Sequence, residues 1–126
     1  MLISKLGQVM LYVNNQEEAV EFWTEKVGFH VIADVTEGPV RWIEIAPTKD
    51  AETSLVLHNK EAIASMSPEL HLGTPSLLFY SDRLEQLRDH LVNQKVIVGE
   101  LVSMPTGKVF NFADHEENYF AVLEKK

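Results

Sequence analysis

The sequence contains one order of elements twice, and this internal repeat restricts the fold more than any other feature. In the first copy, a strand-forming run at residues 8–13 is followed by an amphipathic stretch that ends at Gly28. In the second copy a similar run begins at Ser76, which lies 68 positions after Gln8. Two further pairs keep this spacing, namely Asn14 with Asp82 and Glu17 with Glu85. The sequence therefore predicts one structural unit used twice.

Helix signals follow the first strand of each copy. Asn14 and Asp82 are residue types that accept hydrogen bonds from the free N–H groups at a helix start, and a glutamate follows each of them three positions later. Apolar residues then recur at helical spacing, and Gly28 suits the left-handed conformation that ends a helix. The pattern predicts a helix that ends before Gly28 in the first copy and a helix over Leu84–Asn93 in the second.

Three strands are expected after each helix. They cover residues 29–35, 40–46 and 53–58 in the first copy and residues 96–102, 108–113 and 119–124 in the second. The repeat continues here, because residues 41–46 match 108–113 at an offset of 67 and residues 54–57 match 119–122 at an offset of 65. With the initial strands at 8–13 and 76–80, each copy is a βαβββ unit.

The expected fold is α+β, with two tandem βαβββ units. A unit with one helix and four strands covers only one face of its sheet, so the other face is left for a cleft. Side by side, two such units would form a strongly curved, eight-stranded mixed sheet around a cleft, with the helices outside. A single domain is expected over residues 1–126, with the first unit at about 5–59, a crossing segment at about 60–75 and the second unit at about 76–126.

A formal net charge of −8 and the absence of cysteine restrict the classes of function. Without a basic surface there is little to replace counterions on a nucleic acid or an anionic membrane, so neither is an expected partner. Without cysteine the chain has no disulfide, thiolate ligand or cysteine nucleophile. The sequence shows no bilayer-length apolar run and no signal segment, so a cytoplasmic location is expected.

Residues 13–29 resemble a known family signature. Val13-Asn-Asn, Ala19 and Phe22-Trp-Thr-Glu-Lys-Val-Gly-Phe29 are similar to the V-x-D…S-x-x-F-Y-x-x-x-L-G-F pattern of the vicinal oxygen chelate superfamily. This superfamily includes glyoxalase I, the bleomycin-resistance proteins, the fosfomycin-modifying enzymes and the extradiol dioxygenases. The resemblance covers both units and implies the same fold. Because that fold hosts lyases, transferases, dioxygenases and drug-binding proteins, it leaves the function open.

The resemblance also locates the positions of a metal site. Enzymes of this superfamily hold a divalent metal with four side chains, one from the first and one from the last strand of each unit. By resemblance these positions fall on Gln8, Val56, Ser76 and Ala121. Valine and alanine offer no lone pair, and a serine hydroxyl is a poor ligand. The resemblance therefore implies a member that lacks the usual metal site, needs no cofactor and has an apolar cleft floor.

Strand alternation predicts which other side chains face the cleft together with these four positions. The expected ligand-binding residues are Gln8, Met10, Tyr12, Trp42, Val56, Ser76, Leu78, Tyr80, Tyr119 and Ala121. His58 and Glu44 are candidates for a catalytic acid and base on the same face. Each prediction has a structural alternative: a solvent-exposed histidine at a strand end, a surface or ion-paired glutamate, and aromatic residues that simply fill the core. A separate metal site made of His58, His71 and Glu44 is a further alternative, although their spacing matches no ligand motif.

The expected function is binding of a small molecule without a metal, with sequestration of a toxic compound as its role, as in bleomycin resistance. One alternative is a divergent metal-dependent or acid–base lyase or isomerase of the glyoxalase type. Another is an interaction module whose cleft is filled by its own side chains. The resemblance also implies a homodimer.

Overall fold

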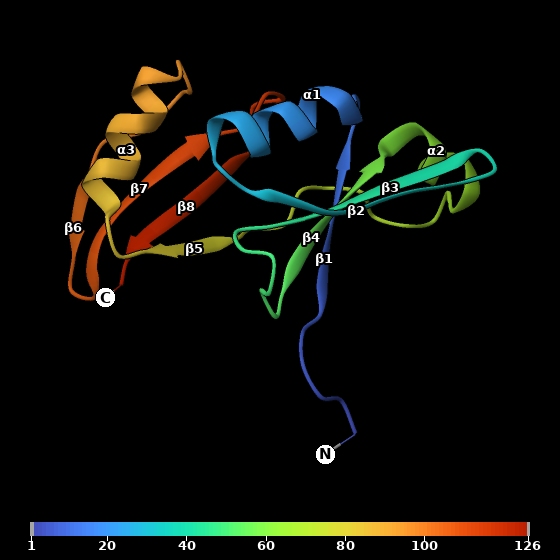
Figure 1. Cartoon of the computed structure of the whole chain (residues 1–126), viewed down its shortest axis with the longest axis horizontal. Helices are drawn as coiled ribbons and strands as arrows, with labels where there is room; N and C mark the ends of the chain where they lie inside the picture. The colour runs from blue at the N-terminus through green and yellow to red at the C-terminus, as the bar shows by residue number, and fades with distance from the viewer. Residues whose placement is uncertain (1, 126) are drawn as a thin grey trace. The chain divides into compact units, whose positions relative to one another are not determined.

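The computed structural model describes residues 2–125, which divide between Thr74 and Pro75 into two compact units. The first contains, in chain order, β1 (Gln8–Val13), α1 (Gln16–Glu21), the π-helix η1 (Phe22–Lys26), β2 (His30–Glu37), β3 (Val40–Ala46), β4 (Ser54–Asn59) and α2 (Lys60–Met66). The second contains β5 (Leu78–Ser81), α3 (Leu84–Asn93), β6 (Val102–Met104), β7 (Gly107–Ala113) and β8 (Tyr119–Glu124) (Figure 1). The two predicted βαβββ units are confirmed.

Each unit has its own four-stranded mixed sheet, and the two sheets have the same topology. The strand order is β1-β4-β3-β2 in the first unit and β5-β8-β7-β6 in the second. In both, the first and last strands of the unit pair in parallel, and the remaining neighbours pair antiparallel. The repeat in the sequence is therefore a repeat in topology, and the eight strands of residues 2–125 form two hydrogen-bonded sheets of four.

One face of each sheet is buried under the helix of its own unit. In the first unit Ile43, Ile45 and Leu57 have no exposed surface, nor has Trp23 of η1. Since side chains alternate along a strand, burial of these positions leaves their neighbours Trp42, Glu44, Val56 and His58 on the opposite face. In the second unit the equivalent core, adjacent to α3, consists of Phe110, Phe112, Phe120 and Val122.

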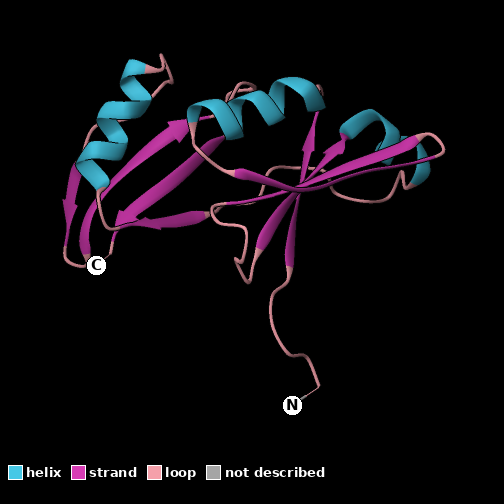
Figure 2. Cartoon of the chain, in the orientation of Figure 1, coloured by secondary structure: helices cyan, strands magenta, loops and turns pink. Residues whose placement is uncertain are grey.

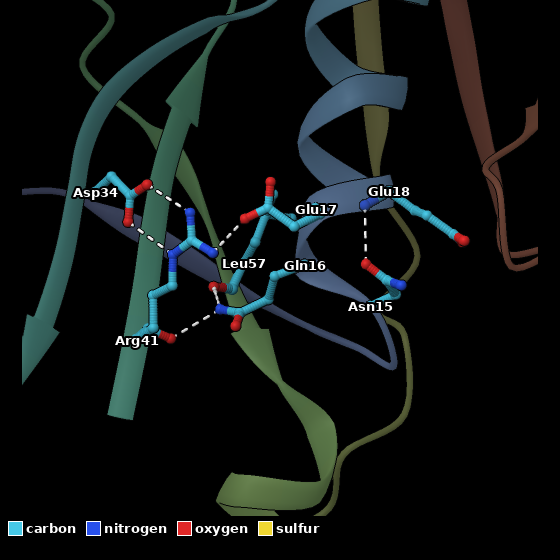
Figure 3. Close-up of polar contacts among 7 residues, drawn as sticks. All are labelled: Asn15, Gln16, Glu17, Glu18, Asp34, Arg41 and Leu57. Carbon is cyan, nitrogen blue, oxygen red and sulfur yellow. Dashed lines mark hydrogen bonds and ion pairs between the residues drawn. The ribbon is translucent and has the colours of Figure 1, made fainter. Parts of the chain in front are cut away.

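The N-cap of each helix lies one residue later than predicted. Asn15 rather than Asn14 is the N-cap of α1, and its Oδ1 accepts a hydrogen bond from the Glu18 N–H at 3.0 Å (Figure 3). The α3 cap position is Arg83 rather than Asp82. The predicted residue type is therefore correct for the first helix, and its position is wrong by one.

The two glutamates of the repeat form ion pairs instead of capping boxes. Glu17 of α1 pairs with Arg41 of β3, and Glu85 of α3 pairs with Lys108 of β7 at 2.9 Å. The hydrogen bond and charge of Lys108 lower the pKa of Glu85, and those of Glu85 raise the pKa of Lys108. These four residues occupy equivalent places in the repeat, so the same helix-to-strand contact is made in each unit.

Helix α1 continues directly into η1, where the turn widens. The Val27 N–H donates to the Phe22 carbonyl at 3.2 Å, a spacing of five residues instead of the four of an α-helix. Figure 2 shows α1 and η1 as one uninterrupted helical ribbon. Gly28 follows with φ +96°, which confirms the predicted left-handed stop.

The predicted strand at residues 96–102 is largely wrong. Regular pairing begins only at β6, and before it Val98 makes an isolated bridge to Phe112. The Gly99 carbonyl accepts hydrogen bonds from Nε and Nη2 of Arg88 in α3, at 3.0 and 2.9 Å. The stretch keeps two hydrogen bonds to β7, from the Gly99 N–H to the Asn111 carbonyl at 2.7 Å and from the Ala113 N–H to the Ile97 carbonyl at 2.9 Å, without forming a regular strand. No helix within residues 2–125 has the length and apolar character needed to cross a membrane.

Candidate functional site

The face of the first sheet opposite α1 carries most of the residues predicted for the site. We call this face the open face, and the strand register arranges its side chains in three rows across the sheet. The rows are Tyr12–His58–Trp42–Val35, then Met10–Val56–Glu44–Ala33, then Gln8–Ser54. The prediction that Trp42 and Glu44, rather than Ile43 and Ile45, lie on this face is confirmed by the burial of the two isoleucines.

The first row is aromatic. The rings of Tyr12 and His58 are stacked, with centroids 5.7 Å apart and planes at 23°. Trp42 lies opposite His58 on the neighbouring strand, and its side chain is half-buried. The three rings come from three adjacent strands, and the strand register places them in one row across the sheet.

His58 is half-buried and chemically distinct from a solvent-exposed strand-end histidine. Its Nε2 lies 3.2 Å from Sδ of Met10. Its Nδ1 is buried and has no hydrogen-bond partner among the described residues. Burial lowers the pKa of His58 below the ordinary 6.5, because the charged imidazolium loses solvation. The ring is therefore neutral at pH 7.

The third row and Glu44 form a polar cluster. Oε2 of Glu44 accepts a hydrogen bond from Oγ of Ser54 at 2.6 Å and a longer one from Nε2 of Gln8 at 3.4 Å. Ser54 is 5% exposed, so the hydroxyl group that holds the Glu44 carboxylate is itself buried. Ser54 lies two residues before Val56, so strand alternation predicts it on the same face, and the structure adds its hydrogen bond to Glu44.

Met10 and Val56 share the middle row with Glu44. Val56 is 2% exposed, whereas Met10 is 36% exposed. The open face therefore has an aromatic row, a middle row that combines apolar side chains with the Glu44 carboxylate, and a polar row. Such a surface suits an amphiphilic small molecule, because its apolar part gains burial while a few fixed polar groups orient it.

The second unit places its predicted residues on one face of its own sheet. Leu78 pairs with Ala121, and Tyr80 pairs with Leu123, which is two residues from Ala121. Leu78, Tyr80 and Tyr119 are each more than half exposed, and Nζ of Lys125 lies 5.0 Å from the Tyr80 ring centroid. Ser76 is exposed and precedes β5, so the predicted strand start at this residue is wrong.

The alternative metal site is not assembled. Within residues 2–125, no three side chains of the types His, Cys, Asp or Glu gather closely enough to hold a metal ion. His71 lies between α2 and β5, in neither sheet. His58 and Glu44 do share the open face, one row apart on neighbouring strands.

Gln16, which the sequence did not single out, fixes α1 to β3 and β4, two of the three strands that carry the aromatic row. Its Nε2 donates to the carbonyls of Arg41 at 2.8 Å and Leu57 at 3.0 Å (Figure 3). These carbonyls belong to the residues directly before Trp42 and His58. A buried glutamine directly after the helix cap is the signal that could have identified it, because a buried polar side chain needs hydrogen-bond partners.

Arg41 adds a second polar contact between α1 and the sheet. Its guanidinium binds both carboxylate oxygens of Asp34, with Nε–Oδ1 at 2.9 Å and Nη2–Oδ2 at 2.7 Å, and it also pairs with Glu17 (Figure 3). The hydrogen bonds and charge of Arg41 lower the pKa of Asp34, and the two carboxylates raise the pKa of Arg41. This network lies on the α1 side of the sheet, away from the open face.

This protein is similar to known proteins in both sequence and fold. Residues 5–122 match the family model described as the Glyoxalase/Bleomycin resistance protein/Dioxygenase superfamily. The chain is 35% identical over 124 residues to the uncharacterized protein YetH of Bacillus subtilis (strain 168), covering 98% of this chain and 100% of YetH.

Two solved structures from Streptomyces sp. CB03234 are similar. One is TnmS3, described as an antibiotic binding protein, with a TM-score of 0.85, 30% identity, and coverage of 100% of this chain and 99% of TnmS3. The other is a glyoxalase/bleomycin resistance protein, with a TM-score of 0.77, 29% identity, and coverage of 94% and 99%. Because the family match spans almost the whole chain, this protein belongs to the Glyoxalase/Bleomycin resistance protein/Dioxygenase superfamily, as its resemblance to the vicinal oxygen chelate signature predicted.

Proposed function

We propose that this protein binds a small amphiphilic molecule and sequesters it, protecting the cell from a toxic compound. The observation that carries the proposal is the three-row arrangement of the open face, in which an aromatic row lies next to a row that holds a buried valine and a fixed carboxylate. The similarity to TnmS3, an antibiotic binding protein, supports this class of ligand.

Ligand binding in this proposal needs no metal. The family's ligand positions on the last strand of each unit are Val56 and Ala121, whose side chains carry no donor atom. Gln8, the candidate ligand in the first strand, hydrogen-bonds Glu44. The residues present therefore do not fit the usual four-ligand site. Dialysis against EDTA is expected to leave ligand affinity unchanged, and a loss of affinity that Mn²⁺, Ni²⁺, Zn²⁺ or Fe²⁺ restores would contradict this part of the proposal.

The proposal includes a homodimer, as in many relatives. Leu78, Tyr80 and Tyr119 are large apolar residues that are more than half exposed on the second unit, and exposed apolar surface of this kind commonly marks an interaction site. Size-exclusion chromatography with light scattering tests the dimer, and a monomeric mass at micromolar concentration would exclude it.

The fluorescence of Trp42 provides a direct binding test. The protein has two tryptophans, of which Trp23 is fully buried and Trp42 is half-buried on the open face. A ligand on the open face should change the emission of wild type and leave that of Trp42→Phe unchanged. The panel would contain peptide, polyketide and aminoglycoside antibiotics, with growth of an expressing strain under each compound as the second readout. Saturable binding together with raised tolerance is expected; binding that leaves the Trp42 emission unaltered would place the ligand elsewhere.

A lyase or isomerase that uses His58 and Glu44 is the second candidate function. It is favoured by the position of His58 and Glu44 on one face of the sheet, and by the lowered pKa of His58, which keeps the ring in the basic form at pH 7. Turnover of an α-keto-aldehyde, epoxide or catechol by the wild type, lost in His58→Gln with the fold intact, would establish this candidate. A complete lack of turnover across these substrates would eliminate it.

A further inference from the structure

We infer that the open face selects ligands in which a planar aromatic system carries a protonated amine, with the rings on the Tyr12–His58–Trp42 row and the amine at Glu44. This inference rests on the proposed function and names the chemical class of its ligand. It follows from the charge, the bonding capacity and the spacing of the residues on this face.

The distribution of charged side chains favours a cation. Among the strands β1 to β4, all within the described residues, Arg41 is the one lysine or arginine. Its side chain lies on the α1 side of the sheet and binds Glu17 and Asp34. The open face therefore carries the carboxylate of Glu44, and that of Glu37 at the end of β2, without a cationic side chain from its own strands.

Glu44 has unused capacity to accept a hydrogen bond. Both of its contacts, from Ser54 and Gln8, involve Oε2, and both donors are neutral. A carboxylate has about four acceptor positions on its two oxygens, so Oε1 remains open to a ligand donor. The neutral donors hold the carboxylate in place without cancelling its charge, so an ammonium group would meet an oriented anion.

The aromatic row adds no opposing charge. Burial keeps His58 neutral at pH 7, and Tyr12 and Trp42 present ring faces or edges to a ligand. Glu44 follows Trp42 by two residues on β3, a rise of roughly 7 Å. A ligand that contacts both should have its amine separated from the ring centre by about this length.

Three naphthalene compounds with the same ring and a three-carbon chain test the inference. They are 3-(1-naphthyl)propylamine, 3-(1-naphthyl)propan-1-ol and 4-(1-naphthyl)butanoic acid, which are cationic, neutral and anionic at neutral pH. Calorimetry would measure their dissociation constants for wild type, Glu44→Gln and Glu21→Gln. Glu21 is an exposed residue of α1, on the other side of the sheet. Glu21→Gln removes one negative charge, as Glu44→Gln does, and therefore controls for the change in net charge.

The wild type should bind the amine about tenfold more tightly than the alcohol, because the ammonium group adds an ion pair to its hydrogen bond with the carboxylate, whereas the hydroxyl group makes the hydrogen bond alone. The acid should bind more weakly than either. Glu44→Gln should weaken binding of the amine more than that of the alcohol and so abolish the preference, and a circular dichroism spectrum equal to that of wild type would show that the variant is folded. Glu21→Gln should behave as wild type.

The outcomes separate this inference from the proposed function. Equal binding of the amine and the alcohol, tighter binding of the acid, or an equal effect of both glutamate variants would overturn the amine inference while leaving small-molecule binding in place. Failure of all three compounds to bind wild type would count against both. If Mn²⁺ binds wild type but not Glu44→Gln and displaces the amine, the cluster would be a cation site, and the inference would also be wrong.

Discussion

Replacing Gln16 by glutamate should destabilise the first unit by about 3 kcal/mol at about pH 8, although the two side chains have nearly the same shape. Gln16 is 9% exposed, and both of its hydrogen bonds are donated to backbone carbonyls, those of Arg41 at 2.8 Å and Leu57 at 3.0 Å. A carboxylate has no proton to donate, so both bonds are lost. At a net contribution of roughly 1 kcal/mol each, this accounts for about 2 kcal/mol.

The remaining destabilisation comes from charge. The carboxylate would be largely desolvated and would face two carbonyl oxygens, both of which disfavour the ionised form and raise its pKa in the folded state. One unit of pKa shift corresponds to about 1.4 kcal/mol. Because the folded pKa lies above the unfolded value of about 4.3, the protonated form stabilises the variant at low pH, and this stabilisation disappears as the pH rises through the folded pKa. A protonated carboxyl can donate one bond, so the defect should be smallest at about pH 4.

Urea unfolding followed by tryptophan fluorescence measures this effect directly, since Trp23 and Trp42 both lie in the first unit. The quantity to compare is the difference in unfolding free energy between wild type and variant at each pH, which removes titrations common to both. Gln86→Glu, the same chemical change at an exposed position of α3, is the matched control and should show no such difference when followed by circular dichroism. An unchanged midpoint for Gln16→Glu at about pH 8, or a defect that does not depend on pH, would refute the assigned role of these two hydrogen bonds.

Three further changes test other parts of the structure. Gly28→Ala should cost about 1–2 kcal/mol of stability in chemical denaturation, because the φ angle of Gly28 is +96°, which alanine adopts only with strain. A steric clash does not contribute, since no atom lies within 4 Å of an added Cβ. Gly7→Ala, at an equally uncrowded position without a left-handed φ, is the control, and equal losses of stability in the two variants would contradict the conformational explanation. Between about pH 7.5 and about pH 5, wild type should lose more stability than His58→Gln, because the unfolded histidine takes up a proton at a higher pH than the buried one; parallel pH curves would disprove this. Trp42→Ala should weaken binding of any aromatic ligand about tenfold in calorimetry, and unchanged affinity of the folded variant would remove Trp42 from the site.

The sequence predicts the helices and strands well wherever the local pattern of apolar residues matches the face that is buried in the folded protein. Leu84–Asn93, Val40–Ala46 and Tyr119–Glu124 have the predicted bounds, because their apolar spacing is set by a buried face. The prediction is largely wrong at residues 96–102, where Arg88 of α3 donates to the Gly99 carbonyl, a contact that the local sequence pattern does not indicate.

The candidate site follows the same rule. Alternation along β1, β3 and β4 predicts which side chains face away from the helix, and the register then places Glu44 and His58 on one surface. Alternation cannot show that the Ser54 hydroxyl binds Glu44, or that Gln16 bonds the backbone beneath the aromatic row, because those contacts depend on the register of strands and on the position of α1. The roles of the site residues in binding remain predictions for the experiments above.

The widened turn of η1 explains a small irregularity in the repeat. In the first unit, Arg41 of the third strand follows Glu17 of the helix by 24 positions. In the second unit, Lys108 follows Glu85 by 23 positions. The helical segment is likewise one residue longer in the first unit, Gln16 to Lys26 against Leu84 to Asn93. A π-turn holds one extra residue without shifting the segments on either side. The first unit thus absorbs a single-residue insertion inside its helix, and the equivalent ion pair forms in both halves of the protein.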